Sequence, residues 1–411
     1  MKKILAILMT LAMITAMVCA GGVTAAADDN VEIHYAYWAS MDEYYEQCKA
    51  AYEAAHPGIT IVLEHTSWGE YWTKLEAAAT GGSVADVFQM NGVNITKYAD
   101  GGILLPIDDY IAASEVDLAN YPEAMNNMYN FNGTHYGIAM DYDTTGLWYN
   151  KALFDKAGVA YPTSDWTWDD LAAAAKALTG VEDGVYGIAA GYSDQQGFYN
   201  TCFAEGGWFV DGEKFGFNEP GTRAGIQCWV DLMKENVSPS EASLEETEGY
   251  LRFMAGKLGM IFSGDWLVAY YASDDSTVKD VCDVVELPLM SSGNRASVIH
   301  GKANCVSAFT AHPDEAYAWV DYLAGAEANE KLGKMGVAIP SYLAYSDAFV
   351  TTYPQYNMGI YSKAAAEYSY VYPSALDPRW SEIMWTELVK AFNLETTVDQ
   401  ACDEIMKQLG Q

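Results

Sequence analysis

The chain has 411 residues, of which 51% are hydrophobic, and its 56 Asp and Glu outnumber its 22 Lys and Arg to give a formal net charge of −34. This length exceeds one ordinary domain and suits two, and the apolar content excludes an intrinsically disordered protein. The strong negative charge argues against nucleic acid or an anionic membrane surface as a partner.

The N-terminus has the pattern of an export signal. Two lysines precede an apolar stretch over residues 4–20, and small residues ending at alanines 25–27 fit a cleavage site. We therefore predict a signal peptide over residues 1–27. Two alternatives stay open. The apolar stretch is about long enough for a membrane anchor, and Cys19 is a candidate for lipid attachment, although the residues before it depart from the usual lipobox.

After this signal, apolar patterns predict alternating strands and helices. We expect strands over 31–37, 59–64 and 84–90, and helices over 41–55, over 70–79 and around 98–100. Such alternation predicts a mostly parallel sheet with helices on its faces.

The rest of the chain is more helical. A capping box of Thr167 and Asp170 predicts a helix over 168–178, with Gly180 as its C-cap. We expect a short buried strand over 258–262, leading into a turn over 263–266, and an extended segment over 298–310. Further helices are predicted over 313–323, 380–392 and 397–409.

Motifs of catalysis and metal binding are missing from the sequence. It has no H-E-x-x-H, no G-x-S-x-G, no P-loop and no G-x-G-x-x-G. The six cysteines after residue 27 show no C-x-x-C and no zinc spacing, so we expect buried free thiols, with one disulfide left open. We therefore predict no catalytic residue, no metal site and no cofactor.

Several blocks, in order along the chain, resemble the substrate-binding proteins of carbohydrate ABC importers (extracellular solute-binding family 1, the maltose-binding-like group). The most specific is GTHYGIAMDYDTTGLWYNKALFDKA at 133–157. The others cover 86–110, 166–171, 256–266, 313–323 and 338–341. One departure is that the third strand ends in Gln89-Met90-Asn91, where the maltose pattern has Trp, so maltose itself is not implied.

The resemblance implies an α/β, two-lobe periplasmic-binding-protein-like fold (type II) with three hinge crossings and a ligand cleft between the lobes. The N-terminal lobe would comprise 28–139 plus 303–336, the C-terminal lobe 143–299 plus 341–411, with hinges near 139–143, 300–303 and 336–340. It also implies an extracytoplasmic protein, with no enzymatic activity, that captures a mono- or oligosaccharide by lobe closure and delivers it to the permease subunits of an ABC transporter. We expect a monomer.

Sugars offer apolar faces to aromatic rings and hydroxyls to carboxylates, amides and N–H groups. The resemblance places a stacking tryptophan at Trp266 and a sugar-contacting acid at Asp143. The other expected ligand-binding residues lie at strand ends, at crossings and at a C-terminal helix. They are Trp38, Ser40, Asn91, Asp141, Tyr142, Phe198, Tyr199, Asp265, His300, Gly301, Arg379 and Trp380. Trp68, Tyr71 and Trp72 fit helix packing better than the wall of the cleft.

Two other functions compete with sugar binding. The same fold could hold a non-sugar solute, either a polyol or a cation such as a polyamine, because Asp141, Asp143 and Asp265 together with aromatic rings would suit a cation. A phosphate ligand is disfavoured, since only Arg379 and Lys302 are basic near the expected cleft. A secreted glycosidase would need two carboxylates facing each other across the cleft, and abundant acids alone do not indicate that.

Overall fold

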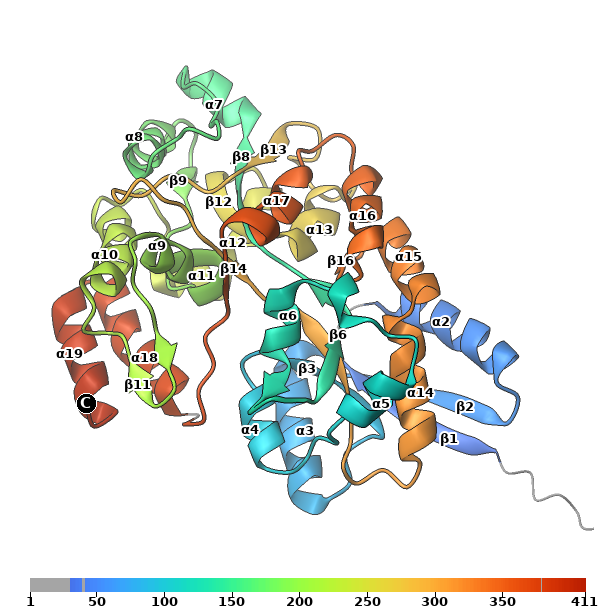
Figure 1. The fold of residues 1–411 in the computed structure, drawn as a ribbon. Coiled ribbons are helices and arrows are strands. Elements are labelled where there is room, and N and C mark those ends of the chain that lie inside the picture. Colours follow the sequence, from blue (N-terminus) through green and yellow to red (C-terminus); the bar gives the residue numbers. More distant parts are fainter. Residues whose placement is uncertain (1–29, 39–40, 378) are drawn as a thin grey trace, which may run out of the picture.

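The computed structural model describes residues 30–38, 41–377 and 379–411 (Figure 1). The predicted signal peptide, Cys19 and Ser40 lie outside the described residues. The strands are β1 (Val31–Tyr37), β2 (Ile59–His65), β3 (Val87–Asn91), β4 (Asn130–Phe131), β5 (Thr134–His135), β6 (Gly137–Ala139), β7 (Asp141–Tyr142), β8 (Thr145–Asn150), β9 (Tyr186–Ile188), β10 (Val210–Asp211), β11 (Lys214–Phe215), β12 (Leu258–Gly264), β13 (Cys282–Val285), β14 (Ser297–Ile299), β15 (Lys302–Val306), β16 (Ile339–Pro340) and β17 (Ser369–Val371).

The α-helices are α2 (Asp42–Ala55), α3 (Trp68–Gly81), α4 (Ile95–Asp100), α5 (Asp108–Ala113), α6 (Glu123–Met128), α7 (Lys151–Ala157), α8 (Trp168–Leu178), α9 (Tyr199–Ala204), α10 (Pro220–Lys234), α11 (Glu241–Glu246), α12 (Gly249–Met254), α13 (Val268–Tyr271), α14 (Pro313–Ala324), α15 (Ala326–Met335), α16 (Ser346–Thr352), α17 (Gly359–Glu367), α18 (Arg379–Phe392) and α19 (Val398–Gln408). Four short turns of other helix types are η1 (Leu118–Asn120), the π-helix η2 (Asp194–Phe198), η3 (Asp265–Leu267) and η4 (Leu343–Tyr345).

Two sheets organise the molecule. One has five strands in the order β2-β1-β3-β15-β6, with β1 parallel to β2 and β3, and β15 antiparallel to β3 and β6. The other has four strands in the order β13-β8-β12-β9. Helices pack around each sheet, so the molecule has two lobes, which Figure 1 shows side by side. We call them the N-terminal and the C-terminal lobe, after the five-stranded and the four-stranded sheet.

The chain passes three times between the two lobes. It leaves the five-stranded sheet after β6 and enters the other sheet at β8. It returns between β14 and β15, and it crosses again after α15, where β16 pairs with β7. The first two passages also touch each other, because Asp143 and His300 form an isolated bridge. The predicted fold class is therefore confirmed in its two α/β lobes and three crossings.

Each lobe has its own aromatic core. Tyr35, Tyr45 and Trp319 pack together in the N-terminal lobe, and Trp229, Phe262 and Trp380 belong to the core of the C-terminal lobe. A third cluster draws on both sheets and on the passages between them, including Met90, Tyr142 and Trp148. Burial of rings of this size is the main stabilising contribution at each of these places.

Local sequence signals explain several helix ends. The predicted capping box of Thr167 and Asp170 starts α8, and a second box, of Thr397 and Gln400, starts α19. Thr179 is the C-cap of α8, and the predicted cap Gly180 lies one position later with φ of +76°, where glycine is favoured. The segment predicted as extended over 298–310 divides into β14 and β15, because the chain changes lobes between them.

A segment of the C-terminal lobe touches the N-terminal lobe. Residues 372–377, which we call the strap, connect β17 to α18, and Figure 1 shows them running between the lobes. In the strap, Ser374 Oγ lies 2.8 Å from Thr96 Oγ and donates to the carbonyl oxygen of Val93 at 3.2 Å. The strap therefore holds the two lobes in contact at a site distant from the crossings in sequence.

The six cysteines of residues 41–411 are all free thiols, five of them buried. The disulfide that the sequence left open is absent from the part of the chain described. No helix in these described ranges is both long and apolar enough to cross a lipid bilayer.

Candidate functional site

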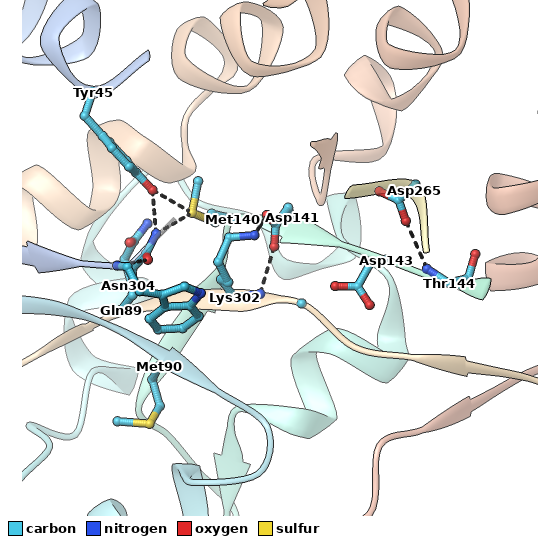
Figure 2. A network of polar contacts seen from close by, with 12 residues as sticks. Tyr45, Gln89, Met90, Met140, Asp141, Asp143, Thr144, Asp265, Lys302 and Asn304 are labelled. Carbon is cyan, nitrogen blue, oxygen red and sulfur yellow. Dashed lines mark hydrogen bonds and ion pairs between the residues drawn. The ribbon is translucent and has the colours of Figure 1, made fainter. Parts of the chain in front are cut away.

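Polar side chains gather where the passages between the lobes meet the ends of the sheets. Figure 2 shows them running from Tyr45 and Gln89, through Lys302 and Asp141, to Asp143 and Asp265. The carboxyl ends of strands and the points where the chain changes direction are where open α/β sheets bind ligands. This is the candidate site, and its two ends differ in chemistry.

Asp141 and Lys302 form the centre of this group. Asp141 is almost fully buried, and its Oδ1 accepts a hydrogen bond of 2.8 Å from the backbone N–H of Lys302. Its Oδ2 forms an ion pair with the Lys302 ammonium. Because both carboxylate oxygens are engaged within the protein, Asp141 holds the first two passages together and offers little capacity for a ligand.

Asp143 lies between Asp141 and Asp265, as Figure 2 shows. Its Oδ1 accepts a hydrogen bond of 2.6 Å from Gln195 Nε2. Burial, reinforced by the nearby charge of Asp141, raises the pKa of Asp143 to about 7, against the opposing effect of Lys302 and Gln195. This carboxyl group is therefore harder to ionise than a solvent-exposed aspartate.

Asp265 begins η3 directly after β12 and is 1% exposed. Its Oδ1 accepts a hydrogen bond of 3.2 Å from the backbone N–H of Thr144. Burial and the charge of Asp143 raise the pKa of Asp265 well above its usual range. A carboxyl group that keeps its proton can both donate to and accept from a sugar hydroxyl.

His300 connects the hinge to both lobes. Its Nε2 accepts a hydrogen bond of 3.2 Å from the backbone N–H of Gly92 in the N-terminal lobe. Its ring lies 4.8 Å from the ring of Tyr372 in the strap, and Tyr372 in turn donates to Asp194. Burial, with a smaller contribution from Lys302, lowers the pKa of His300 to about 3, so the imidazole is neutral at physiological pH.

At the other end of the group, tryptophans form a partly open platform on the N-terminal lobe. Trp38 follows β1 and contacts Trp68, Tyr71 and Trp72 with ring-centroid distances of 5.5, 5.0 and 5.4 Å. Trp68 is 53% exposed. Its indole packs edge-on against Trp72 of the same helix at 5.6 Å, as predicted, but the rest of the ring is open to solvent. Tyr71 is buried and does pack.

Trp266 lies on the C-terminal lobe, next in sequence to Leu267, which lines a hollow. It is part-buried, in η3, and its indole lies so close to Gly264 that a side chain there would collide with it. A hollow of about 230 Å³ opens nearby between β12, η2 and the start of α12. Its lining mixes polar Gln196, Glu241 and Glu248 with apolar Leu267. This mixture of carboxylates, an amide and apolar surface suits a polar ligand with apolar faces.

Other predicted site residues lie in the protein core in this structure. Phe198 and Tyr199 are completely buried and pack on Phe209, so they do not form an open wall. Trp380 is 2% exposed and stacks near Phe215, because it lies on the face of α18 that is turned toward the core of the lobe. These three expectations are corrected: the rings stabilise the C-terminal lobe.

Four more predicted residues have structural partners. Asn91 is buried and accepts from both nitrogens of Asn94, and Tyr142 donates to Ser362. Gly301 is required where two passages meet, since a Cβ there would lie 2.3 Å from the carbonyl oxygen of Asp141. Arg379 is exposed, and its guanidinium pairs at 2.7 Å with Asp377 in the same segment instead of reaching a clamp position.

Sequence reasoning missed two of the polar partners. Gln195, which bonds Asp143, and Tyr372, which packs on His300, carry no motif and lie 52 and 72 residues from these partners. The sequence indicates Lys302 only as a basic residue near the expected cleft, because its pairing with Asp141 depends on how the passages cross. Over the described residues, no group of three or more His, Cys, Asp or Glu side chains is arranged to hold a metal ion.

Comparisons with known proteins agree with this architecture. The family described as bacterial extracellular solute-binding protein matches residues 35–330. A binding protein of Brucella abortus (strain 2308) is 25% identical over 70% of this chain and 70% of its own. The arabinooligosaccharide-binding protein of Bacillus subtilis (strain 168) is 23% identical over 80% of this chain and 78% of its own.

Among solved structures, an ABC substrate-binding protein from Listeria monocytogenes, determined in complex with cycloalternan, superposes with a TM-score of 0.84. It is 24% identical, and the match covers 93% of this chain and 99% of the Listeria chain. At this identity the likeness shows the fold, and it confirms the two-lobe architecture.

Proposed function

This chain belongs to the family of bacterial extracellular solute-binding proteins, and we propose that it is the component of an ABC importer that captures a carbohydrate between its two lobes. Membership places it among binding proteins and not among enzymes. The observation that carries the proposal is a cluster at the passages between the lobes: Asp143 and Asp265, whose pKa values are raised, lie close together there, and the rings of Trp38 and Trp266 pack part-buried on the hydrophobic cluster that joins the lobes.

The chemistry of the site favours a neutral, hydroxyl-rich ligand. Asp143 and Asp265 have raised pKa values, so a protonated carboxyl at either position can both donate to and accept from a sugar hydroxyl. Asp141, the third acid of the cationic alternative, is already paired with Lys302. Polyols and polyamines therefore remain outcomes of the test, with a mono- or oligosaccharide as the proposed ligand.

The export of the protein and the motion of its lobes are part of the same proposal. Residues 1–27 would direct export and be removed, or Cys19 would anchor the mature chain by a lipid, and the monomer would deliver its ligand to permease subunits outside the cytoplasm. The N-terminal lobe would comprise 28–139 plus 303–336, and the C-terminal lobe 143–299 plus 341–411. Rotation about the hinges near 139–143, 300–303 and 336–340 would close the cleft.

A thermal-shift screen of the chain from residue 28 tests this function. The panel contains maltotriose, mannotriose, arabinotriose and cycloalternan, with sorbitol and spermidine as the non-sugar arms. A ligand present at a hundred times its Kd stabilises the folded state by about 2.7 kcal/mol, which is a shift of several degrees. We expect at least one sugar to raise the Tm and neither non-sugar compound to do so.

A matched pair of tryptophan variants then places the site. Trp266→Ala should abolish the sugar-dependent shift, whereas Trp385→Ala, which removes a 51%-exposed indole from α18, should retain it. A shift with spermidine alone would replace the carbohydrate by a cationic ligand. A sugar shift that survives Trp266→Ala would move the site away from the C-terminal lobe.

A further inference from the structure

Gln89 is a buried amide directly beneath the Trp38 platform. It lies in β3, is completely buried, and sits next to Met90 at the edge where the candidate site begins (Figure 2). A fully buried carboxamide must find hydrogen-bond partners to offset the loss of water. Its partners show what it does.

The oxygen of the Gln89 carboxamide accepts a backbone hydrogen bond where the pairing of β1 with β3 ends. Strands β1 and β3 pair only at Tyr35 with Val87 and at Ala36 with Phe88, so beyond Ala36 the two backbones diverge. At that point the backbone N–H of Trp38 donates to Gln89 Oε1 at 3.1 Å. The side chain of Gln89 thus anchors the backbone of Trp38 where the ladder no longer reaches it.

The nitrogen of the carboxamide fixes its orientation. Nε2 donates to the hydroxyl of Tyr45 and, at 3.5 Å, to the sulfur of Met140, while the Tyr45 hydroxyl also donates to that sulfur at 3.3 Å. Since the Trp38 N–H can only donate, rotating the amide by 180° would set two donors against each other. The network therefore holds the oxygen toward Trp38.

A second contact, made by the main chain of Gln89, leads to the indole through Tyr71. The hydroxyl of Tyr71 donates to the backbone oxygen of Gln89 at 2.7 Å, and the Tyr71 ring meets the Trp38 ring nearly edge-on at 65°. The backbone of Trp38 is thus held by the side chain of Gln89, while Tyr71, which packs on the Trp38 ring, is held by the main-chain carbonyl of the same residue. Preorganisation of an aromatic face in this way reduces what binding costs in lost side-chain freedom.

We propose that Gln89 is a positioning residue that sets the Trp38 indole at the angle needed to stack on the sugar. This deepens the proposed function and rests on it, because it assigns the platform to the carbohydrate. The Gln89 side chain does not touch the ligand; it acts through the N–H of Trp38, whose ring also packs on Tyr71.

The first test needs no ligand. The protein is labelled with 5-fluorotryptophan, and the Trp38 line is assigned in ¹⁹F NMR spectra from its loss in Trp38→Phe. Gln89→Leu, which keeps the volume but removes the acceptor, should shift or broaden the Trp38 line. The line of Trp229, buried in the core of the C-terminal lobe, should stay in place. Gln89→Glu keeps an acceptor oxygen in either protonation state and should restore the Trp38 line.

The second test uses affinity, with maltotriose, mannotriose and arabinotriose as probes in titration calorimetry. Gln89→Leu should weaken binding of the trisaccharide that binds the unmodified protein by about tenfold, the scale of one aromatic contact. In a Trp38→Ala background the same substitution should have no further effect, because its target is gone. If Gln89→Leu does not fold, Gln89→Asn replaces it, since it is one methylene too short to reach both partners.

An unchanged Trp38 line in Gln89→Leu would overturn the proposal, as would a shift of the Trp229 line by the same amount. The proposal would also be overturned if the affinity loss of the double variant equalled the product of the losses of Gln89→Leu and Trp38→Ala. Failure of all three sugars to bind would count against the carbohydrate function alone, because the ligand-free spectra still decide the role of Gln89.

Discussion

The two ends of the candidate site are preorganised by different means. On the N-terminal lobe, Trp38 is held by uncharged groups: a carboxamide, tyrosine hydroxyls and a thioether. At the hinge, Asp141, Asp143 and Asp265 gather around Lys302, and burial works against the charge of two of them. The first end should be insensitive to pH, and the second should respond strongly both to pH and to the loss of one charge.

The largest effect is expected when the hinge loses its positive charge. Lys302→Met leaves the Asp141 carboxylate buried without its partner, which costs about 3–5 kcal/mol in the free energy of unfolding. Urea unfolding at pH 7.5 measures it. The matched control is Lys334→Met, whose ammonium is 66% exposed and pairs with Glu330 on the surface of α15.

That control should change the unfolding free energy by less than about 0.5 kcal/mol, because exposed ion pairs contribute little. Equal losses in the two lysine variants would mean that the hinge pair is no more important than a surface pair, and the contrast between the two ends of the site would fail.

The pH dependence of the hinge gives the next effect. The pKa of Asp143 is raised to about 7, so the folded state resists ionisation of a group that ionises readily once unfolded. The destabilisation of the folded state by Asp143 is absent below pH 4, grows as the pH rises toward 7 and is constant above that. Asp143→Asn should therefore stabilise the protein at pH 8 by about 1 kcal/mol or more, since one pKa unit corresponds to about 1.4 kcal/mol.

Urea unfolding of Asp143→Asn and of the unmodified protein at pH 4, 5, 6, 7 and 8 measures this difference, with the exposed Asp183→Asn as control. The carboxamide introduced by Asp143→Asn keeps an oxygen for Gln195, so the hydrogen bond survives. A difference that does not change with pH would show that the hinge acid is not strained by burial.

A smaller and pH-independent loss is expected on the N-terminal lobe. Tyr45→Phe removes a hydroxyl that accepts from Gln89 and donates to Met140, and it should cost about 1 kcal/mol. The same urea series tests it. A loss that varied between pH 5 and pH 8 would contradict the uncharged character of this end.

The smallest effect belongs to the strap. Ser374→Ala removes the contacts to Thr96 and Val93 but no buried charge, and it should lower the unfolding free energy by about 0.5 kcal/mol. Thr351→Ala, which removes an exposed hydroxyl bonded only within α16, is the control. In small-angle scattering, we expect Ser374→Ala and not Thr351→Ala to broaden the distribution of lobe arrangements.

Much of the fold was readable from the sequence. The strand over 31–37 and the helix over 168–178 were predicted to the residue, since a periodic apolar pattern and a capping box are local signals. The two-lobe architecture came from the resemblance of ordered blocks and not from periodicity. The placement of β15 inside the sheet, between β3 and β6, has no local signal in the sequence.

The site was harder to predict for a physical reason. Trp38 and Trp380 both lie at the edge of a secondary-structure element, and the sequence treats them alike. Only packing distinguishes the indole that is part-buried on a platform from the one that fills a core. The pairing of Asp143 with Gln195 depends likewise on the π-helix η2, whose backbone bends at Gly197. The two adjacent glutamines in its sequence do not predict such a bend.

The placement of β15 has a consequence for the order of folding. Residues 302–306 lie between two strands of the N-terminal lobe, yet they follow every strand of the four-stranded sheet in the chain. A growing or truncated chain that ends before Lys302 leaves β3 and β6 with unpaired edges and without their shared neighbour. The N-terminal lobe, although first in sequence, is therefore completed later than the C-terminal lobe. Its assembly is slow because β15 must close the long loop of chain that begins after β6.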